Sequence, residues 1–185
     1  MFINVIPEKC TGCRACEVFC PLEQEGVINP ILSRIQVWKD APHDLFLPLV
    51  CPPCADKACM AACPEPGAMV IDSRMGAVVI VEALCTGCSK CIGACDIGAI
   101  GLVRPLSMSK GGRGKNGKAV AVKCNQCKGE TWCVKVCEPG ALEYVAETPE
   151  LNGQMVFERL RAARIQAEAV LAERGAQSRR RVKVQ

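Results

Sequence analysis

The sequence predicts an α+β fold in which two pseudo-symmetric modules, nested one inside the other along the chain, are followed by a C-terminal helix. Three observations lead to this prediction. The 185 residues include 16 cysteines, and these fall into four groups of four. The last two groups repeat the order of the first two, which indicates an internal duplication. A Gly-Ala pair and a short apolar segment of strand length follow three of the four groups.

The four cysteine groups have two kinds of spacing. Groups one and three have gaps of two, two and three residues between successive cysteines, whereas groups two and four have a longer second gap. In chain order the groups are Cys10, Cys13, Cys16 and Cys20; Cys51, Cys54, Cys59 and Cys63; Cys85, Cys88, Cys91 and Cys95; Cys124, Cys127, Cys133 and Cys137. Groups one and three match the bacterial ferredoxin run, in which three cysteines hold one [4Fe–4S] cluster and the fourth binds the neighbouring cluster. We therefore expect bacterial ferredoxin-like modules with two clusters each, and four [4Fe–4S] clusters in all.

Groups two and three are joined by a short connection, residues 64–84. Its pattern predicts a β-hairpin with strands at 68–71 and 77–81 around a turn at 72–76. Because a hairpin returns the chain to where it began, this connection favours an inner module, residues 51–104, built from groups two and three.

Groups one and four then form an outer module from residues 1–50 and 105–148. In this module we expect a strand at 2–6 to pair with a strand at 142–146. The alternative pairs group one with group two and group three with group four. The sequence leaves that alternative open.

In the nested arrangement each group gives its fourth cysteine to its partner group. The predicted ligand sets are Cys10, Cys13, Cys16 and Cys137; Cys20, Cys124, Cys127 and Cys133; Cys51, Cys54, Cys59 and Cys95; Cys63, Cys85, Cys88 and Cys91. Four zinc sites would also use sixteen thiolates. Zinc ribbons, however, usually present two Cys-x2-Cys knuckles separated by a long spacer, so the spacing favours iron–sulfur clusters.

Four other residues are expected to shape or tune the cysteine loops. Gly12 and Gly87 precede the second cysteine of groups one and three, where glycine can adopt the positive φ that a tight wrap demands. Pro21 follows the last cysteine of group one and is expected to end the helical segment there. Asp96 replaces this proline in group three. A carboxylate beside a cluster repels an added electron, so one hypothesis is that Asp96 lowers the reduction potential of the cluster bound by Cys95. The alternative is a solvated aspartate at a turn, and the sequence leaves both open.

The composition excludes several classes of protein. Aromatic residues are only 4% of the chain, too few for the base-stacking surfaces of nucleic-acid-binding proteins. The formal charge of +4 counts every cysteine as neutral, whereas four clusters at about −2 each would bring the chain to about −4. We therefore expect no nucleic-acid partner. No apolar stretch is long enough to span a membrane, and thiols without a signal peptide before Cys10 favour the cytoplasm.

Residues 149–185 differ from the rest of the chain, and their pattern predicts a C-terminal helix with a basic tail. An apolar residue recurs at helical spacing, at Val156, Leu160, Ala163, Ala167 and Val170 or Leu171. Gly175 is expected to end the helix. The apolar stripe is wider than a lone helix needs. We therefore expect it to pack on a partner or to support self-association through a neighbouring copy.

The sequence predicts no catalytic residue. It contains no constellation of serine, histidine or paired carboxylates typical of an active site. His43 is the only histidine, and in a proline-rich connection it is expected to be a surface residue. The chain is therefore expected to move electrons and not to catalyse a reaction by itself.

Over residues 1 to about 146, the cysteine motifs resemble the four-cluster polyferredoxin subunits of molybdenum and tungsten oxidoreductases. That family includes the iron–sulfur subunits of dimethyl sulfoxide reductase and formate dehydrogenase type enzymes. A shorter segment is similar to the compact subunits that accompany tungsten-dependent aldehyde oxidoreductases and class II benzoyl-CoA reductases; it is Asn29-Pro30-Ile31-Leu32-Ser33-Arg34-Ile35.

The resemblance implies an electron-transfer subunit whose four clusters form a wire between a large metallopterin catalytic subunit and an external donor or acceptor. The short segment favours a tungsten aldehyde oxidoreductase-like partner. A flavin- or ferredoxin-type redox protein is the external partner that the resemblance implies. The alternatives are a subunit of a benzoyl-CoA reductase, formate dehydrogenase or dimethyl sulfoxide reductase type enzyme, and a free-standing polyferredoxin electron carrier.

Overall fold

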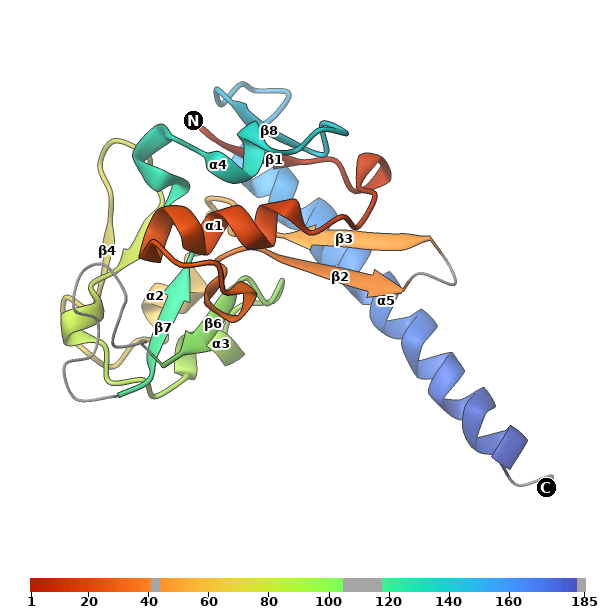
Figure 1. The fold of residues 1–185 in the computed structure, drawn as a ribbon. Helices are drawn as coiled ribbons and strands as arrows, with labels where there is room; N and C mark the ends of the chain where they lie inside the picture. Colours follow the sequence, from red (N-terminus) through yellow and green to blue (C-terminus); the bar gives the residue numbers. More distant parts are fainter. Residues whose placement is uncertain (41–43, 105–117, 183–185) are drawn as a thin grey trace.

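The computed structural model describes residues 1–40, 44–104 and 118–182, and Figure 1 shows their arrangement. Predictions about His43, residues 105–117 and the last three residues of the tail lie outside this part. The strands are β1 (Phe2–Val5), β2 (Gln36–Asp40), β3 (Leu45–Leu49), β4 (Met69–Ile71), β5 (Val78–Ile80), β6 (Ile100–Val103), β7 (Val120–Lys123) and β8 (Leu142–Val145). The α-helices are α1 (Ala15–Glu25), α2 (Ala58–Ala61), α3 (Lys90–Gly93), α4 (Trp132–Lys135) and α5 (Gly153–Val182).

The described strands form four two-stranded antiparallel sheets. The two ends of the cysteine-bearing region meet in one of them, because β1 pairs with β8 and Phe2 lies opposite Val145. This confirms the predicted pairing of the first strand with the strand after group four. The β4–β5 hairpin lies where the connection between groups two and three predicts it. Its turn is held by the Asp72 carboxylate, which accepts a hydrogen bond from the Arg74 N–H at 2.9 Å.

Two further hairpins occupy equivalent places in the duplicated sequence. The β2–β3 hairpin leads from group one to group two, and β6 and β7 pair between groups three and four. Buried side chains from β1, β3, α5 and other segments meet in one apolar cluster, and residues of β4 and β5 pack in another. Phe2 on β1, Leu47 on β3 and Leu160 on α5 are each at most 1% exposed. The core therefore joins segments that are far apart in the sequence.

We expected helix α1 to end at Pro21, but the helix continues to Glu25. A proline inside a helix removes one backbone hydrogen bond, and here packing outweighs that loss, because Pro21 is buried and α1 lies against α4. The helix ends at Gly26, whose left-handed backbone lets its N–H reach the Leu22 carbonyl oxygen at 2.9 Å.

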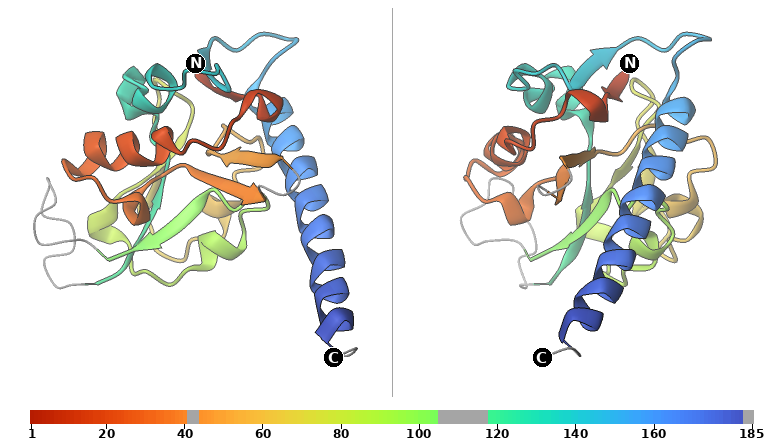
Figure 2. Two further views of the ribbon diagram at one scale, coloured as in Figure 1. Left: turned by 45° about the vertical axis from the view of Figure 1, so that its right-hand side comes forward. Right: turned by 90° about the vertical axis from the view of Figure 1, so that its right-hand side faces the viewer.

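Helix α5 runs along one side of the body, and its C-terminal end extends beyond it (Figures 1 and 2). Val156 and Leu160 are fully buried, and α5 contacts β1 and β3. The Arg159 guanidinium donates to the Val5 carbonyl oxygen at 2.9 Å. The predicted apolar stripe therefore packs on the chain itself as far as Ala167, whereas Val170 and Leu171 are exposed.

The prediction that Gly175 ends α5 is wrong, because the helix continues to Val182. One glycine costs a helix about 1 kcal/mol relative to alanine, and no proline follows it in the sequence. Among the described residues, no helix is both long enough and apolar enough to cross a membrane.

Candidate metal centres

The structure gathers the sixteen cysteines into four hollows, each lined by three cysteines of one group and one of another. Each predicted set of four is brought together. Site A has Cys10, Cys13, Cys16 and Cys137; site B has Cys20, Cys124, Cys127 and Cys133; site C has Cys51, Cys54, Cys59 and Cys95; site D has Cys63, Cys85, Cys88 and Cys91.

Positive-φ backbone shapes the loops of sites A and D. Gly12 and Gly87 have φ of +67° and +70°, as the sequence predicts. A side chain at Gly87 would also collide with the Ala119 carbonyl oxygen. Arg14 and Ser89 then adopt left-handed conformations directly before α1 and α3. This sharp turn directs the loop around the hollow before the helix that carries the third cysteine begins.

The helices connect neighbouring sites. Cys16 and Cys20 are both buried on α1, one helical turn apart, and belong to sites A and B. Cys59 of site C and Cys91 of site D share one apolar cluster. Sites B and C meet where the Cys124 thiol lies close enough to that of Cys51 to interact with it electrostatically. The four sites therefore form a row in the order A, B, C, D.

Both ends of this row reach the surface, whereas site B is covered. Cys13 of site A and Cys88 of site D are exposed. In site B, by contrast, Cys20, Cys124 and Cys133 are buried. A group bound at site A or D would be accessible to another protein, and a group at site B would not.

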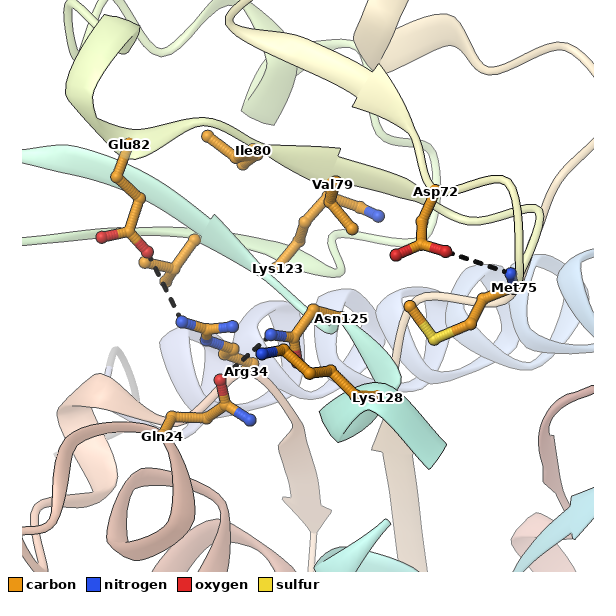
Figure 3. Close-up of a pocket in the computed structure, with 11 residues that line it drawn as sticks. Gln24, Arg34, Asp72, Met75, Val79, Ile80, Glu82, Lys123, Asn125 and Lys128 are labelled. Carbon is orange, nitrogen blue, oxygen red and sulfur yellow. Dashed lines mark hydrogen bonds and ion pairs between the residues drawn. The ribbon is translucent and has the colours of Figure 1, made fainter. Parts of the chain in front are cut away.

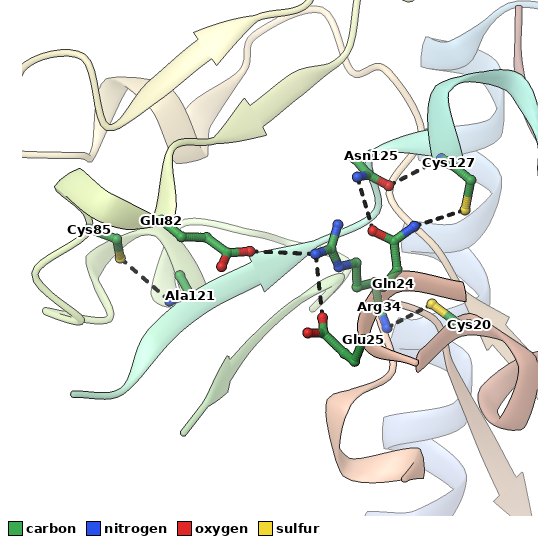
Figure 4. Close-up of polar contacts among 9 residues, drawn as sticks. All are labelled: Cys20, Gln24, Glu25, Arg34, Glu82, Cys85, Ala121, Asn125 and Cys127. Atoms are coloured by element: carbon green, nitrogen blue, oxygen red, sulfur yellow. Dashed lines mark hydrogen bonds and ion pairs between the residues drawn. The ribbon is translucent and has the colours of Figure 1, made fainter. Parts of the chain in front are cut away.

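Several hydrogen bonds reach the sulfurs of site B, two of which are drawn in Figure 4. The Arg34 N–H donates to Cys20 Sγ at 3.3 Å, and the Gln24 amide donates to Cys127 Sγ at 3.1 Å. A further backbone N–H, from Gln126, reaches Cys124 Sγ at 3.3 Å. Donors to ligand sulfurs stabilise added negative charge and raise the reduction potential of an iron–sulfur cluster.

Arg34 also joins α1 to the turn after β5. Its guanidinium lies 3.7 Å from the Glu25 carboxylate and 3.4 Å from the Glu82 carboxylate, and all three side chains are largely buried (Figure 4). Burial raises the pKa of Glu82, and the Arg34 charge partly offsets this rise. Arg34 and Glu82, together with Lys123, help to line a cavity of about 260 Å³ (Figure 3).

A buried lysine lies where sites B and C meet. Lys123 is only 4% exposed, and its ammonium donates to the Cys51 thiol and to the Val78 carbonyl oxygen. It also lies near the sulfurs of Cys59 and Cys124. Burial alone would lower the pKa of Lys123, but the negative charges of these three thiolates outweigh burial and raise it.

Site A has a buried charge of the opposite sign. Glu17 is 5% exposed and directly follows Cys16. Its carboxylate accepts a hydrogen bond from the Val37 N–H at 2.6 Å and pairs with Arg14 at 2.8 Å.

Asp96, beside Cys95 of site C, lies on the surface, where its carboxylate pairs with Arg161 of α5 at 3.4 Å.

The buried thiols are poor anions on their own. Burial, reinforced by Glu17 and by neighbouring thiols, raises the pKa of Cys16 to about 12. Burial likewise raises the pKa of Cys124 to about 12 and that of Cys59 to about 11. Four thiolates can therefore share one hollow only if a cationic group neutralises them. Sulfur donors in sets of four suit the iron of iron–sulfur clusters, so the residues fit that group.

Sequence reasoning did not single out Lys123, Glu17 or the Arg34 ion pairs. A signal existed for Lys123, because a lysine ends the apolar segment directly before Cys124. The burial of Glu17 and the pairing of Arg34 depend on contacts with distant segments.

Within the described ranges, no three histidine, cysteine, aspartate or glutamate side chains lie close enough together to hold a single metal ion.

Two protein-family models match the chain. A 4Fe-4S binding domain matches residues 2–28, and a 4Fe-4S dicluster domain matches residues 43–102. The first segment contains group one, and the second contains groups two and three. Both models describe the binding of iron–sulfur clusters.

Several known proteins resemble the chain over most of its length. The polyferredoxin-like subunit of an aliphatic sulfonate oxidoreductase from Pyrococcus furiosus is 39% identical over 137 residues, which cover 74% of this chain and 71% of that subunit. The electron transport protein HydN of Escherichia coli K12 is 33% identical over 68% of this chain and 73% of its own length. The putative electron transport protein YsaA of the same strain is 32% identical over 77% and 87%.

Among solved structures, a chain of the BamBC active-site complex of benzoyl coenzyme A reductase aligns over 99% of this chain and 96% of its own length. It is 24% identical and gives a TM-score of 0.42, a likeness too distant to support a conclusion about this chain. The 39% identity to the Pyrococcus subunit shows the family of this chain. With its family-model matches and four sites of four thiols, the chain belongs to the family of polyferredoxin-like iron–sulfur proteins that serve as electron-transfer subunits of oxidoreductases.

Proposed function

We propose that the chain holds four [4Fe–4S] clusters, one at each of sites A to D, in two nested ferredoxin-like modules. The outer module comprises residues 1–50 and 105–148, and the inner module comprises residues 51–104. The match of a dicluster domain to residues 43–102 supports the inner pairing, because that segment contains groups two and three but neither of the others. The β1–β8 pairing supports the outer module, because it joins the two ends of that module.

The row of four thiol sites with an exposed cysteine at each end is the observation that carries the functional proposal. When bound, each cluster can accept and release one electron. The protein positions the sites in series, covers site B and leaves Cys13 and Cys88 at the ends of the row open to other proteins. An electron-transfer subunit that connects a catalytic partner with an external donor or acceptor needs this arrangement.

We propose a large metallopterin subunit, containing tungsten or molybdenum, as the catalytic partner. The Pyrococcus furiosus relative is named as a subunit of an oxidoreductase, which supports a multi-subunit complex. The segment that contains Asn29 and Pro30 favours a tungsten enzyme of the aldehyde oxidoreductase type. The sixteen thiols need a reducing environment, so we place this complex in the cytoplasm.

Purification from the native host under anoxic conditions, without a tag, tests the complex. We expect about sixteen irons per chain and a stoichiometric large subunit that contains tungsten or molybdenum. The same iron content with no partner would instead indicate a free-standing polyferredoxin carrier. Zinc in place of iron would overturn the proposal for all four sites.

The Cys20→Ser variant tests the pairing of the modules. In the nested arrangement Cys20 lines site B with cysteines of group four, so the variant should damage that cluster. If group one pairs with group two, the damaged cluster should instead be the one held by Cys51, Cys54 and Cys59. Combining Cys20→Ser with either Cys124→Ser or Cys54→Ser distinguishes the two, because a second change at the same site removes no further cluster.

A further inference from the structure

Lys123 has an uncommon environment for a lysine. It is the last residue of β7, and its buried ammonium contacts Cys51 on a different segment and the Val78 carbonyl oxygen on β5. Lysine is almost never fully buried unless it is paired. Arg34, the other largely buried basic residue near this junction, has two carboxylates as partners.

The partners of Lys123 are cysteine sulfurs and not carboxylates. Within the described residues no carboxylate forms an ion pair with Lys123, whereas the Cys51, Cys59 and Cys124 sulfurs all interact with it. Two of these cysteines line site C and one lines site B. The positive charge is therefore placed between the two middle sites of the row.

We propose that the buried ammonium of Lys123 raises the reduction potentials at sites B and C and so holds a transferred electron at the junction between the two modules. The proposal rests on the proposed function, because it requires clusters at these sites. One-electron reduction adds one negative charge to a site, and a fixed positive charge nearby makes that addition more favourable. The donor of the electron is the oxidoreductase partner and, in the experiment below, dithionite.

The burial of Lys123 strengthens the effect of its charge on the reduction potentials. A charge pair near a protein surface is screened by water and salt, but a buried pair is screened much less. Lys123 lies under β5 and the Cys51 loop, so little solvent reduces its field. Lys128 provides a natural comparison. It directly follows Cys127 of site B and has the same charge, but its side chain is exposed.

The experiment compares Lys123→Met with Lys128→Met in the full-length chain with its clusters in place. Iron content is measured first, because about sixteen irons per chain tests the proposed function independently of the inference. The four midpoint potentials are then measured by redox titration followed by electron paramagnetic resonance. Titrations of Cys13→Ser and Cys88→Ser identify the midpoints that belong to sites A and D, since each substitution alters one terminal site.

We expect Lys123→Met to make reduction about tenfold less favourable at sites B and C, which is a fall of about 59 mV in each midpoint. Sites A and D should shift much less. Lys128→Met should shift the site B midpoint by less than half as much, and Lys123→Arg, which keeps the charge, should leave the potentials near those of the native chain.

Unchanged midpoints in Lys123→Met, an equal fall at all four sites, or an equal effect of Lys128→Met would each overturn the proposal. If Lys123→Met loses iron, Lys123→Gln is titrated in its place, because its amide keeps a donor for the Val78 carbonyl oxygen. Loss of iron from both neutral variants would also overturn the proposal, since the ammonium would then be needed for cluster assembly. Iron content below sixteen in the native chain would count against the proposed function instead.

Discussion

The end of the row at site A and the junction between sites B and C differ in the sign of their nearest buried charge. Beside site A the carboxylate of Glu17 is buried and paired with Arg14. At the junction, the ammonium of Lys123 is buried among cysteine sulfurs. Both regions use four cysteines per site, so the ligands alone do not distinguish them. The difference shows that single buried side chains next to the cysteines give equivalent sites different electrostatic surroundings.

We expect the largest effect, on the free energy of unfolding, from a substitution that removes the buried ion pairs of Arg34. Arg34→Met removes the charge that lies between Glu25 and Glu82. Removing one partner of a buried ion pair typically costs about 3–5 kcal/mol, and the variant should also disturb the Arg34 N–H donor to Cys20. The midpoint of guanidinium unfolding, followed by the visible absorbance of the clusters, measures the loss.

Arg74→Met is the matched control for this change. Arg74 is 72% exposed and lies 3.9 Å from Asp72, so its removal should cost less than about 1 kcal/mol. If the two variants unfold at the same guanidinium concentration, Arg34 does not stabilise the junction.

The opposite charge at site A predicts a shift in the opposite direction from that of Lys123→Met. Glu17→Gln removes a buried negative charge but keeps an acceptor for the Val37 N–H. We expect reduction at site A to become more favourable by up to about tenfold, or about 59 mV, with little change at sites C and D. Redox titration measures this shift. Glu23→Gln, an exposed position on the same helix, is the control, and an equal shift in both variants would show that burial of Glu17 is irrelevant.

The exposure of the two ends predicts an order of iron loss. Sites A and D each contain an exposed cysteine, whereas site B has three buried cysteines. Solvent access to a metal site is controlled by the shell around it, so a chelator should remove iron in two phases, with site B in the slower one. Cys13→Ser and Cys88→Ser should reduce the amplitude of the fast phase. A single phase would show that the sites open together.

The smallest effect is expected at Asp96, which the sequence suggested as a residue that lowers the potential of site C. Its side chain is 54% exposed and pairs with Arg161 at 3.4 Å, so solvent and the guanidinium screen its charge. Asp96→Asn should change reduction at site C less than about twofold. A shift as large as that of Lys123→Met would show that the exposed carboxylate acts on the cluster despite its partner.

The cysteine spacing was sufficient to predict which thiols come together. A loop of fixed spacing places three cysteines around one hollow, and the helix that follows carries the fourth toward the next site, as Cys16 and Cys20 on α1 illustrate. The short connection between groups two and three predicted the β4–β5 hairpin, and the pairing of β1 with β8 followed from the same argument. These features depend on local geometry and on connection length, which are both present in the sequence.

Most of the errors and omissions arose where distant segments meet. Pro21 and Gly175 are local signals for a helix end, but Pro21 is buried in a helix that lies against α4 and Gly175 costs too little to end α5. The charge of Lys123 is visible in the sequence, but its burial between sites B and C depends on β5 and on the Cys51 loop. The sequence by itself determined which thiols come together in sets of four, because this needs only local spacing and short connections. Only the tertiary structure decided the order of the four sites and the charges between them, because both require residues from different groups to lie side by side.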